Sequence, residues 1–226
     1  MREYTKWERF QNWLHYHKIG LAVLALVLWV AGSMIWNVLG IGQVEPDCRI
    51  AYVGSRKLTD DTVAALEKAL APFCADANGD GRVSVALTQH ITAGDSSTDN
   101  MMYGYAAEMT VLADITAGES TFFLLENPVD FQLSFQILAN LDGSIPAEDD
   151  YSALDKVCLW KNCPVLMSLD LGSYEEHYLD ITETGEITQL LENLYLGRRY
   201  FYDPAQQKYP EADEAFWQTI TEGATP

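Results

Sequence analysis

The chain has 226 residues, with 14 Lys and Arg against 33 Asp and Glu, and a formal net charge of −19. This length suits one domain with an accessory segment, since domains mostly span about 100 to 200 residues. Such acidity excludes a broad basic surface for nucleic acid or anionic lipid, because electrostatic repulsion would dominate. We therefore expect no nucleic-acid partner.

Residues 19–42 form a long apolar run, IGLAVLALVLWVAGSMIWNVLGIG, in which only Ser33 and Asn37 are clearly polar and no residue is charged. As a helix this run would reach about 36 Å, enough to cross a hydrocarbon core of about 30 Å. A buried core helix would usually carry a polar face, and a signal peptide usually has an apolar region of about 7 to 15 residues. We predict a retained transmembrane helix over residues 19–42.

The charges beside this run predict its orientation. Four basic residues precede it, and two acidic residues soon follow it: Arg2, Lys6, Arg9 and Lys18, then Glu45 and Asp47. Positive charge favours the cytoplasmic side, so residues 1–18 should be cytoplasmic and residues 43–226 extracytoplasmic. The outer part holds ten Lys and Arg and 31 Asp and Glu, a formal charge of −21. Its acidity leaves cations and basic partners as ligands, although acidity also serves solubility.

Strand and helix patterns alternate from Cys48 onward. Short apolar or alternating runs predict strands at residues 48–54, 83–88 and 121–125. Thr59 is suited to cap a helix after the first strand, and Asn127 with Pro128 is suited to begin a helix after the third.

The helix between them should carry an apolar stripe of Met102, Tyr105, Met109 and Leu112, and the last helix of the series should end at Asp142-Gly143. Residues 48–142 thus read β-α-β-α-β-α. This order predicts an α/β domain with a mainly parallel sheet and right-handed crossovers.

The remainder of the chain is less regular. We predict added strands at residues 165–171, 177–182 and 194–202, because these segments are rich in apolar, β-branched or aromatic residues. A final amphipathic helix is expected over residues 211–221.

All four cysteines lie in the outer part of the chain, where disulfides are permitted by the compartment. Four cysteines allow three connectivities. We favour Cys158 with Cys163 across a short loop, and Cys48 with Cys74 between the start of a strand and the end of the following helix. The spacing suits neither a zinc site nor a thioredoxin-like CxxC motif.

The segment DANGDGRVS, from Asp76 onward, resembles the first nine positions of an EF-hand or dockerin calcium loop. In such a loop Asp76, Asn78 and Asp80 would supply side-chain oxygens, Arg82 a carbonyl oxygen, and Gly81 the sharp turn. Position twelve is Leu87, where the family has a bidentate acidic residue. Either another acidic residue completes a weak calcium site, or the segment is a tight polar turn.

Gly94-Asp95-Ser96 resembles the nucleophile block of GDS-type lipases and esterases. That family pairs its serine with an Asp-x-x-His near the C-terminus, whereas this chain has Glu175-Glu176-His177. The block also follows the second predicted strand, where the family has it after the first. We interpret it as a polar loop and expect His177 to be structural.

Two stretches, IAYVGSRKLTDDTVAALEKAL and LADITAGESTFFLLENPVDFQ, together resemble one lobe of a bacterial extracytoplasmic solute-binding protein. They are also similar to membrane-anchored bacterial proteins that carry this lobe behind a transmembrane helix. The resemblance covers residues 48–142. It implies a site at the carboxyl ends of the strands, near Gly54, Ser55, Glu126 and Asn127.

These observations favour a membrane-tethered extracytoplasmic binding or assembly module over an enzyme. The expected partners are the membrane and another protein, and calcium is the only cofactor that the sequence suggests. The alternative is a membrane-anchored hydrolase that uses the Gly94-Asp95-Ser96 segment. Residues 43–226 suffice for one α/β domain but not for two lobes that close around a solute, so a buried small-molecule cleft is not expected.

Overall fold

The computed structural model describes residues 6–38, 45–92, 98–178 and 181–225, apart from some side chains within these ranges. The chain divides into two compact units, Met1–Glu45 and Pro46–Pro226.

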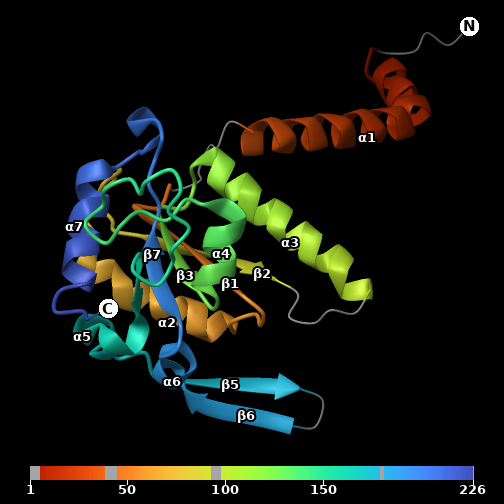
Figure 1. Ribbon diagram of the computed structural model, residues 1–226. Coiled ribbons are helices and arrows are strands. Elements are labelled where there is room, and N and C mark those ends of the chain that lie inside the picture. Colours follow the sequence, from red (N-terminus) through yellow and green to blue (C-terminus); the bar gives the residue numbers. More distant parts are fainter. Residues whose placement is uncertain (1–5, 39–44, 93–97, 179–180, 226) are drawn as a thin grey trace, which may run out of the picture. The chain divides into compact units, whose positions relative to one another are not determined.

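The first unit contains one helix, α1 (Lys6–Val38; Figure 1). Within it, the segment Trp13–Met34 is long and apolar enough to cross a membrane. The most apolar part of this segment is not buried against other described residues. Length and composition alone make the segment a candidate membrane span, and a signal sequence near an N-terminus has the same properties. The predicted apolar helix is confirmed, residues 39–42 lie outside the described residues, and the orientation stays a prediction.

A five-stranded sheet forms the centre of the second unit, in the order β2-β1-β3-β7-β4. Its strands are β1 (Cys48–Gly54), β2 (Val85–Ile91), β3 (Phe122–Leu125), β4 (Val157–Leu159) and β7 (Tyr195–Arg198). Strand β1 pairs in parallel with β2 and β3, whereas β7 pairs antiparallel with β3 and β4. The fold is therefore α/β with a mixed sheet, and the expectation of a mainly parallel sheet is not confirmed.

The parallel part coincides with the predicted β-α-β-α-β unit. Helix α2 (Asp60–Leu70) joins β1 to β2, and α3 (Thr98–Ala117) joins β2 to β3. Thr59 caps α2 as predicted, since its side chain accepts a hydrogen bond of 3.2 Å from the Thr62 backbone N–H.

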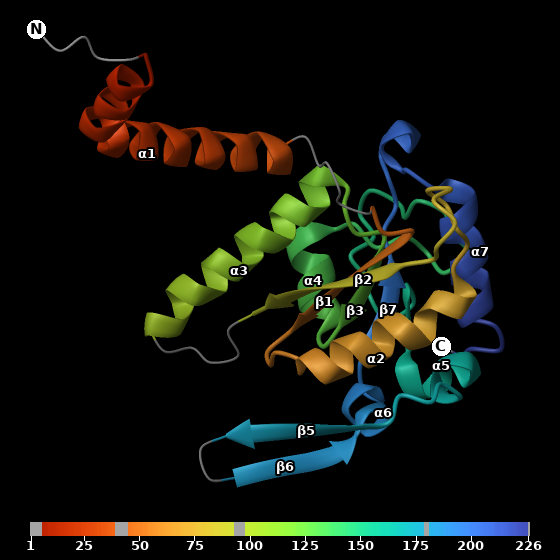
Figure 2. The same cartoon turned by 180° about the vertical axis from the view of Figure 1, so that it is seen from behind.

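Helices cover both faces of the sheet, with α2 and α7 (Pro210–Ile220) on one face and α3 and α4 (Pro128–Phe135) on the other (Figures 1 and 2). Successive strand residues point to opposite faces of the sheet. Ile50 therefore belongs to the apolar core on one face, and Ala51 belongs to the core on the other. This alternation follows from the two-residue period of a strand.

The predicted apolar stripe of α3 is exposed wherever its side chains are described. Tyr105, Met109 and Leu112 are 66%, 63% and 44% exposed, while Ala107 and Val111 are buried. The side chain of Met102 lies outside the described residues. Small side chains on the buried face allow this helix to lie close to the sheet, so the larger ones point outward.

Helix α4 ends earlier than predicted, well before Asp142-Gly143. Gln136 follows Phe135 with a left-handed backbone (φ 51°) that stops the helix, and the Gln132 side chain accepts a hydrogen bond of 3.1 Å from the Leu138 N–H. The chain then passes through a loop to β4. The fully buried Lys156 anchors this loop through an ion pair of 2.8 Å with Asp150.

The C-terminal predictions are partly wrong. Residues 165–171 contain most of α5 (Pro164–Met167) where a strand is predicted, because Pro164 is suited to the first turn of a helix. The predicted strand at 177–182 spans parts of β5 (Ser173–Tyr178) and β6 (Ile181–Glu186), a separate two-stranded hairpin.

The strand expected at 194–202 is the shorter β7, and the final helix is confirmed as α7. The remaining elements are α6 (Ile187–Leu191) and the 3-10 helices η1 (Ala71–Phe73), η2 (Trp160–Asn162) and η3 (Pro204–Gln206).

Candidate functional site

The strand-end residues Gly54, Ser55, Glu126 and Asn127 lie together at one edge of the sheet. Strands β1 and β3 are parallel neighbours with Val53 opposite Leu125, so their carboxyl ends lie side by side. The Ser55 hydroxyl donates a hydrogen bond of 2.9 Å to one oxygen of the Glu126 carboxylate, and the Ser55 N–H donates to the other. Ser55 therefore fixes the orientation of this carboxylate.

Gly54 allows the Tyr52 hydroxyl and Glu126 to approach the backbone closely. A Cβ atom at Gly54 would collide with the Tyr52 hydroxyl and lie 2.9 Å from a Glu126 oxygen. Burial, with a smaller contribution from the negative charge of Glu126, raises the pKa of Tyr52 to about 12. Tyr52 thus stays neutral at physiological pH.

Asn127 has a structural role at this edge. Its side-chain oxygen accepts a hydrogen bond of 3.2 Å from the Asp130 N–H, which caps α4, and its amide donates to the Asp130 carboxylate at 2.6 Å. Asn127 and Pro128 begin the helix as the sequence predicts.

Two cavities share Glu126 as a wall. The larger, which we call the acidic cavity, has a volume of about 660 Å³. Three of its lining residues are the acids Glu108, Glu126 and Asp130, and none of the described lining residues is Lys or Arg. The others are Val53, Gly54, Ser55, Thr92, Asn127, Phe131, Ser134 and Phe135. A cavity with these carboxylates favours a cationic group.

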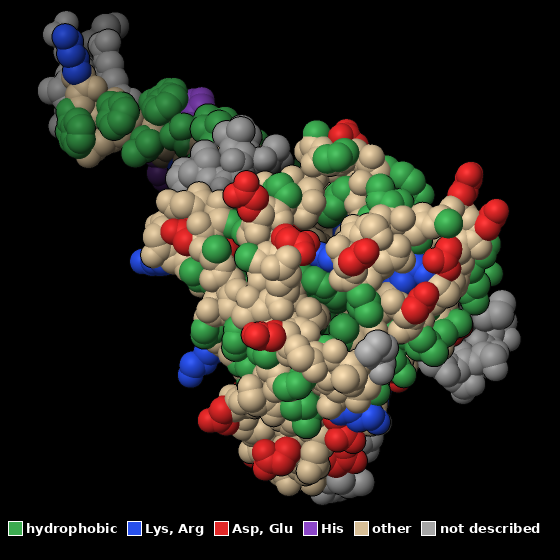
Figure 3. Space-filling model, turned by 60° about the vertical axis from the view of Figure 1, so that its left-hand side comes forward, with side chains coloured by type: hydrophobic (Ala, Val, Ile, Leu, Met, Phe, Trp, Pro, Cys, Tyr) green, Lys and Arg blue, Asp and Glu red, His purple; other side chains and the backbone are tan. Residues whose placement is uncertain are grey.

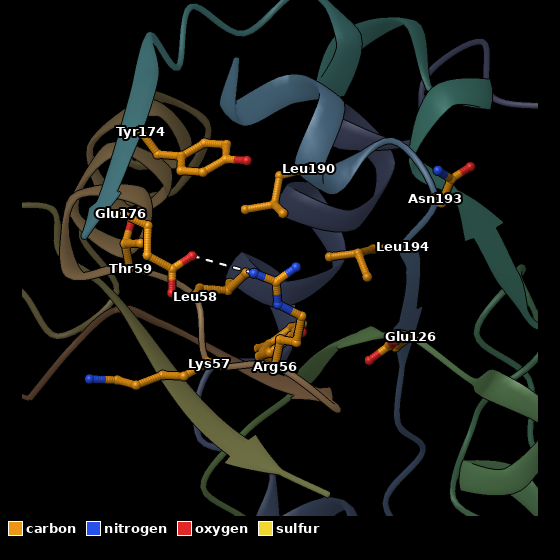
Figure 4. A pocket seen from close by; sticks show the side chains of 11 residues that line it. Arg56, Lys57, Leu58, Thr59, Glu126, Tyr174, Glu176, Leu190, Asn193 and Leu194 are labelled. Atoms are coloured by element: carbon orange, nitrogen blue, oxygen red, sulfur yellow. Dashed lines mark hydrogen bonds and ion pairs between the residues drawn. The ribbon is translucent and has the colours of Figure 1, made fainter. Parts of the chain in front are cut away.

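The smaller cavity has a volume of about 170 Å³ and lies beside the loop that follows β1 (Figure 4). We call it the Arg56 cavity. Its walls combine apolar and aromatic side chains with two cations and two carboxylates: Leu58, Leu190, Leu194, Tyr52, Tyr174, Arg56, Lys57, Glu126 and Glu176, together with Thr59 and Asn193. Neither cavity was predicted from the sequence. The position of Arg56 next to Ser55, just after a predicted strand, was a signal for the Arg56 cavity.

The predicted calcium-loop residues lie in the turn between η1 and β2. The Asp76 carboxylate accepts hydrogen bonds from the backbone N–H groups of Gly79, Asp80 and Gly81 at 2.8, 3.1 and 2.9 Å. The side chains of Asn78 and Asp80 each accept a bond of 2.8 Å from the backbone two residues onward, at Asp80 and Arg82. These bonds account for the shape of the turn without an ion.

The described ranges, the turn included, hold no cluster of metal-ligating side chains. Within them, no group of three or more His, Cys, Asp or Glu side chains is arranged to hold a metal ion. Whether calcium binds at the turn therefore stays a prediction.

The hydrolase segment Gly94-Asp95-Ser96 lies outside the described residues. The backbone of His177 lies in β5, and its side chain is also outside the described residues. The hydrolase alternative and the structural role of His177 therefore stay predictions.

A buried polar network, which no sequence pattern predicted, lies between β2, α3 and the start of β3. His90 contacts the Asp114 carboxylate at 3.4 Å, and the Ser120 hydroxyl donates to that carboxylate at 2.7 Å. Because Ser120 is fully buried and bonds to the acid instead of the imidazole, the arrangement is not that of a nucleophilic triad. It ties three elements of the fold together.

Comparisons of the chain with protein-family models, with curated proteins and with solved structures found no match.

Proposed function

We propose that the chain is a membrane-tethered binding or assembly module on the outer face of a bacterial membrane, and that its strand-end edge binds a protein partner. The apolar α1 helix supplies a membrane tether by length and composition. The resemblance to one lobe of a solute-binding protein agrees with a site at this edge.

The acidic cavity is the observation that carries this proposal. Its volume of about 660 Å³ and its three carboxylates suit a cationic group, such as a Lys or Arg side chain of a partner. Residues 43–226 carry a formal charge of −21, and acidic side chains are spread over the face shown in Figure 3. Long-range attraction would therefore steer a basic partner toward the domain.

The test is recovery of cross-linked partners with the full chain from its native membrane. A cavity variant, Glu108→Gln with Asp130→Asn, should lose a partner that the wild-type chain recovers, and neither residue lines the second cavity beside Arg56. A control variant, Glu148→Gln with Asp149→Asn, removes the same charge from exposed positions outside the cavity and should retain it.

Equal recovery with both variants would contradict the assignment to this cavity. Turnover of a model ester that is lost in Ser96→Ala would instead support the hydrolase alternative.

A further inference from the structure

We propose that the Arg56 cavity binds a carboxylate carried beside an apolar side chain, as at the C-terminus of a peptide, and that Arg56 is the residue that binds the carboxylate. This inference rests on the proposed function, because the ligand would be part of the partner bound at the same edge. It assigns a chemical class to a second subsite, next to the acidic cavity.

Arg56 lines the cavity together with Glu176. Its guanidinium group points toward the Glu176 carboxylate (Figure 4). The ion pair with Glu176 measures 3.4 Å, and the two side chains are 70% and 41% exposed, so solvent screens the pair and it contributes little to stability. A guanidinium offers five N–H donors in a planar fork that matches a carboxylate. Arg56 can therefore bind a second carboxylate beside Glu176, or bind a ligand carboxylate in place of Glu176.

The walls of the cavity are largely apolar. Leu58, Leu190 and Leu194 provide an apolar surface, and the rings of Tyr52 and Tyr174 add to it. A volume of about 170 Å³ is close to that of an apolar cavity of about 150 Å³ that can hold a benzene molecule. The space therefore fits one medium-sized apolar side chain beside the guanidinium.

Glu176 is an internal competitor for the guanidinium. It lies on the β5–β6 hairpin, 120 residues from Arg56 in the sequence, and its carboxylate occupies the position that a ligand carboxylate would take. Glu126 also lines the cavity and would repel an anion, but both of its oxygens accept hydrogen bonds from Ser55. Removing the charge of Glu176 should thus favour an anionic ligand.

Lys57 provides a control of equal charge. It lines the same cavity, but its ammonium group points away from the other labelled side chains and pairs with Asp60 at 3.3 Å (Figure 4). Arg56→Gln and Lys57→Gln therefore change the net charge equally, while only the first removes a group that faces the cavity.

The experiment measures binding of N-acetyl-leucine and of its uncharged amide to the full chain in lipid nanodiscs, by calorimetry. A peptide that ends in leucine, with a free or an amidated C-terminus, is measured in parallel. We expect both free acids to bind and both amides to bind at least tenfold more weakly, which equals about 1.4 kcal/mol. Tighter binding of the peptide acid than of N-acetyl-leucine would identify a chain terminus as the source of the carboxylate, whereas equal binding would identify a small molecule.

The variants give opposite changes. Arg56→Gln should weaken binding of the acids about tenfold, which equals about 1.4 kcal/mol. Lys57→Gln should leave this binding within about twofold, and Glu176→Gln should strengthen it about threefold or more. Arg56 and Lys57 are both exposed, so we expect no change in the melting temperature.

Equal binding of acid and amide, or equal losses in Arg56→Gln and Lys57→Gln, would overturn the proposal. So would Glu176→Gln that binds no more tightly than wild type. These failures would leave the partner test at the acidic cavity unaffected, because that test changes none of Arg56, Lys57 and Glu176. Loss of the partner test with intact binding of the acids would remove the proposed function and keep the carboxylate site.

Discussion

Ser55 and Glu126 lie 71 residues apart in the sequence, yet the hydroxyl of Ser55 donates a hydrogen bond of 2.9 Å to the carboxylate of Glu126. The bond joins the carboxyl ends of two parallel strands, and the carboxylate that it fixes is a wall of both cavities. A change at either residue should therefore affect both subsites of the strand-end edge.

Glu126→Gln should lower the pKa of Tyr52. Burial is the main reason that this pKa reaches about 12, and the charge of Glu126 adds to it. Without that charge the pKa should fall but remain above the ordinary value of 10, because the burial persists. Ultraviolet titration of the tyrosines in wild-type, Glu126→Gln and Tyr52→Phe chains measures this shift, and identical titration curves for wild type and Glu126→Gln would contradict it.

A chain truncated to begin at Gln43 should be soluble and monodisperse without detergent, because the long apolar helix is removed. Protease added outside intact cells should digest the outer domain of the full chain. Protection of the domain until the membrane is broken would reverse the predicted orientation.

The turn after η1 should depend on Asp76 whether or not it binds calcium. Asp76→Ala removes the acceptor of three backbone N–H groups and should cost about 1 kcal/mol of unfolding free energy, the scale of a lost helix cap. Urea denaturation in the presence of a chelator measures this loss. An unchanged midpoint would show that these hydrogen bonds contribute nothing.

Calcium in the millimolar range should raise the melting temperature if the turn is a weak calcium site, and Asp80→Ala should then abolish the rise. A ligand at about 100 times its dissociation constant stabilises a protein by about 2.7 kcal/mol, so the shift would be measurable. Identical melting curves in calcium and in chelator would identify the segment as a plain turn.

The four cysteines lie in the two pairs that the sequence favours, although all four are free thiols in the structure. The thiol of Cys48 lies beside that of Cys74, and the thiol of Cys158 beside that of Cys163. In an oxidising compartment we expect both pairs to form disulfides, which typically contribute about 2 to 4 kcal/mol. Alkylation of the unreduced chain followed by mass analysis should find no modified cysteine, and four modified cysteines would exclude the pairing.

Asp114 should make the fold sensitive to acid. Burial disfavours the charge of Asp114, but hydrogen bonds from His90 and Ser120 outweigh burial and hold its pKa below the ordinary value of 3.8. A lowered pKa in the folded state means that the carboxylate stabilises the fold above the unfolded-state pKa, and that this contribution is lost as the pH falls through the folded-state pKa.

The melting temperature should therefore fall below pH 3.8, and Asp114→Asn should weaken that dependence relative to the exposed control Asp149→Asn. Equal pH profiles of the two variants would argue against this role.

Local sequence determined the features that depend on neighbouring residues alone. The apolar helix follows from an uncharged run that is long enough to cross a membrane, and the Thr59 cap and the Asn127-Pro128 start follow from side chains that bond to the adjacent backbone. The β-α-β-α-β order likewise follows from hydrophobic periods of two and 3.6 residues.

Tertiary structure alone decided the features that join distant segments. The antiparallel return of β7 beside β3, the outward direction of Tyr105 and Met109, and the approach of Glu176 to Arg56 across 120 residues leave no local period in the sequence. Periodicity shows that a helix or strand has an apolar side, but the partner of that side depends on which segments the whole chain brings together. The edge of the sheet was therefore predictable from the order of its parallel strands, whereas the two cavities that share Glu126 as a wall were not.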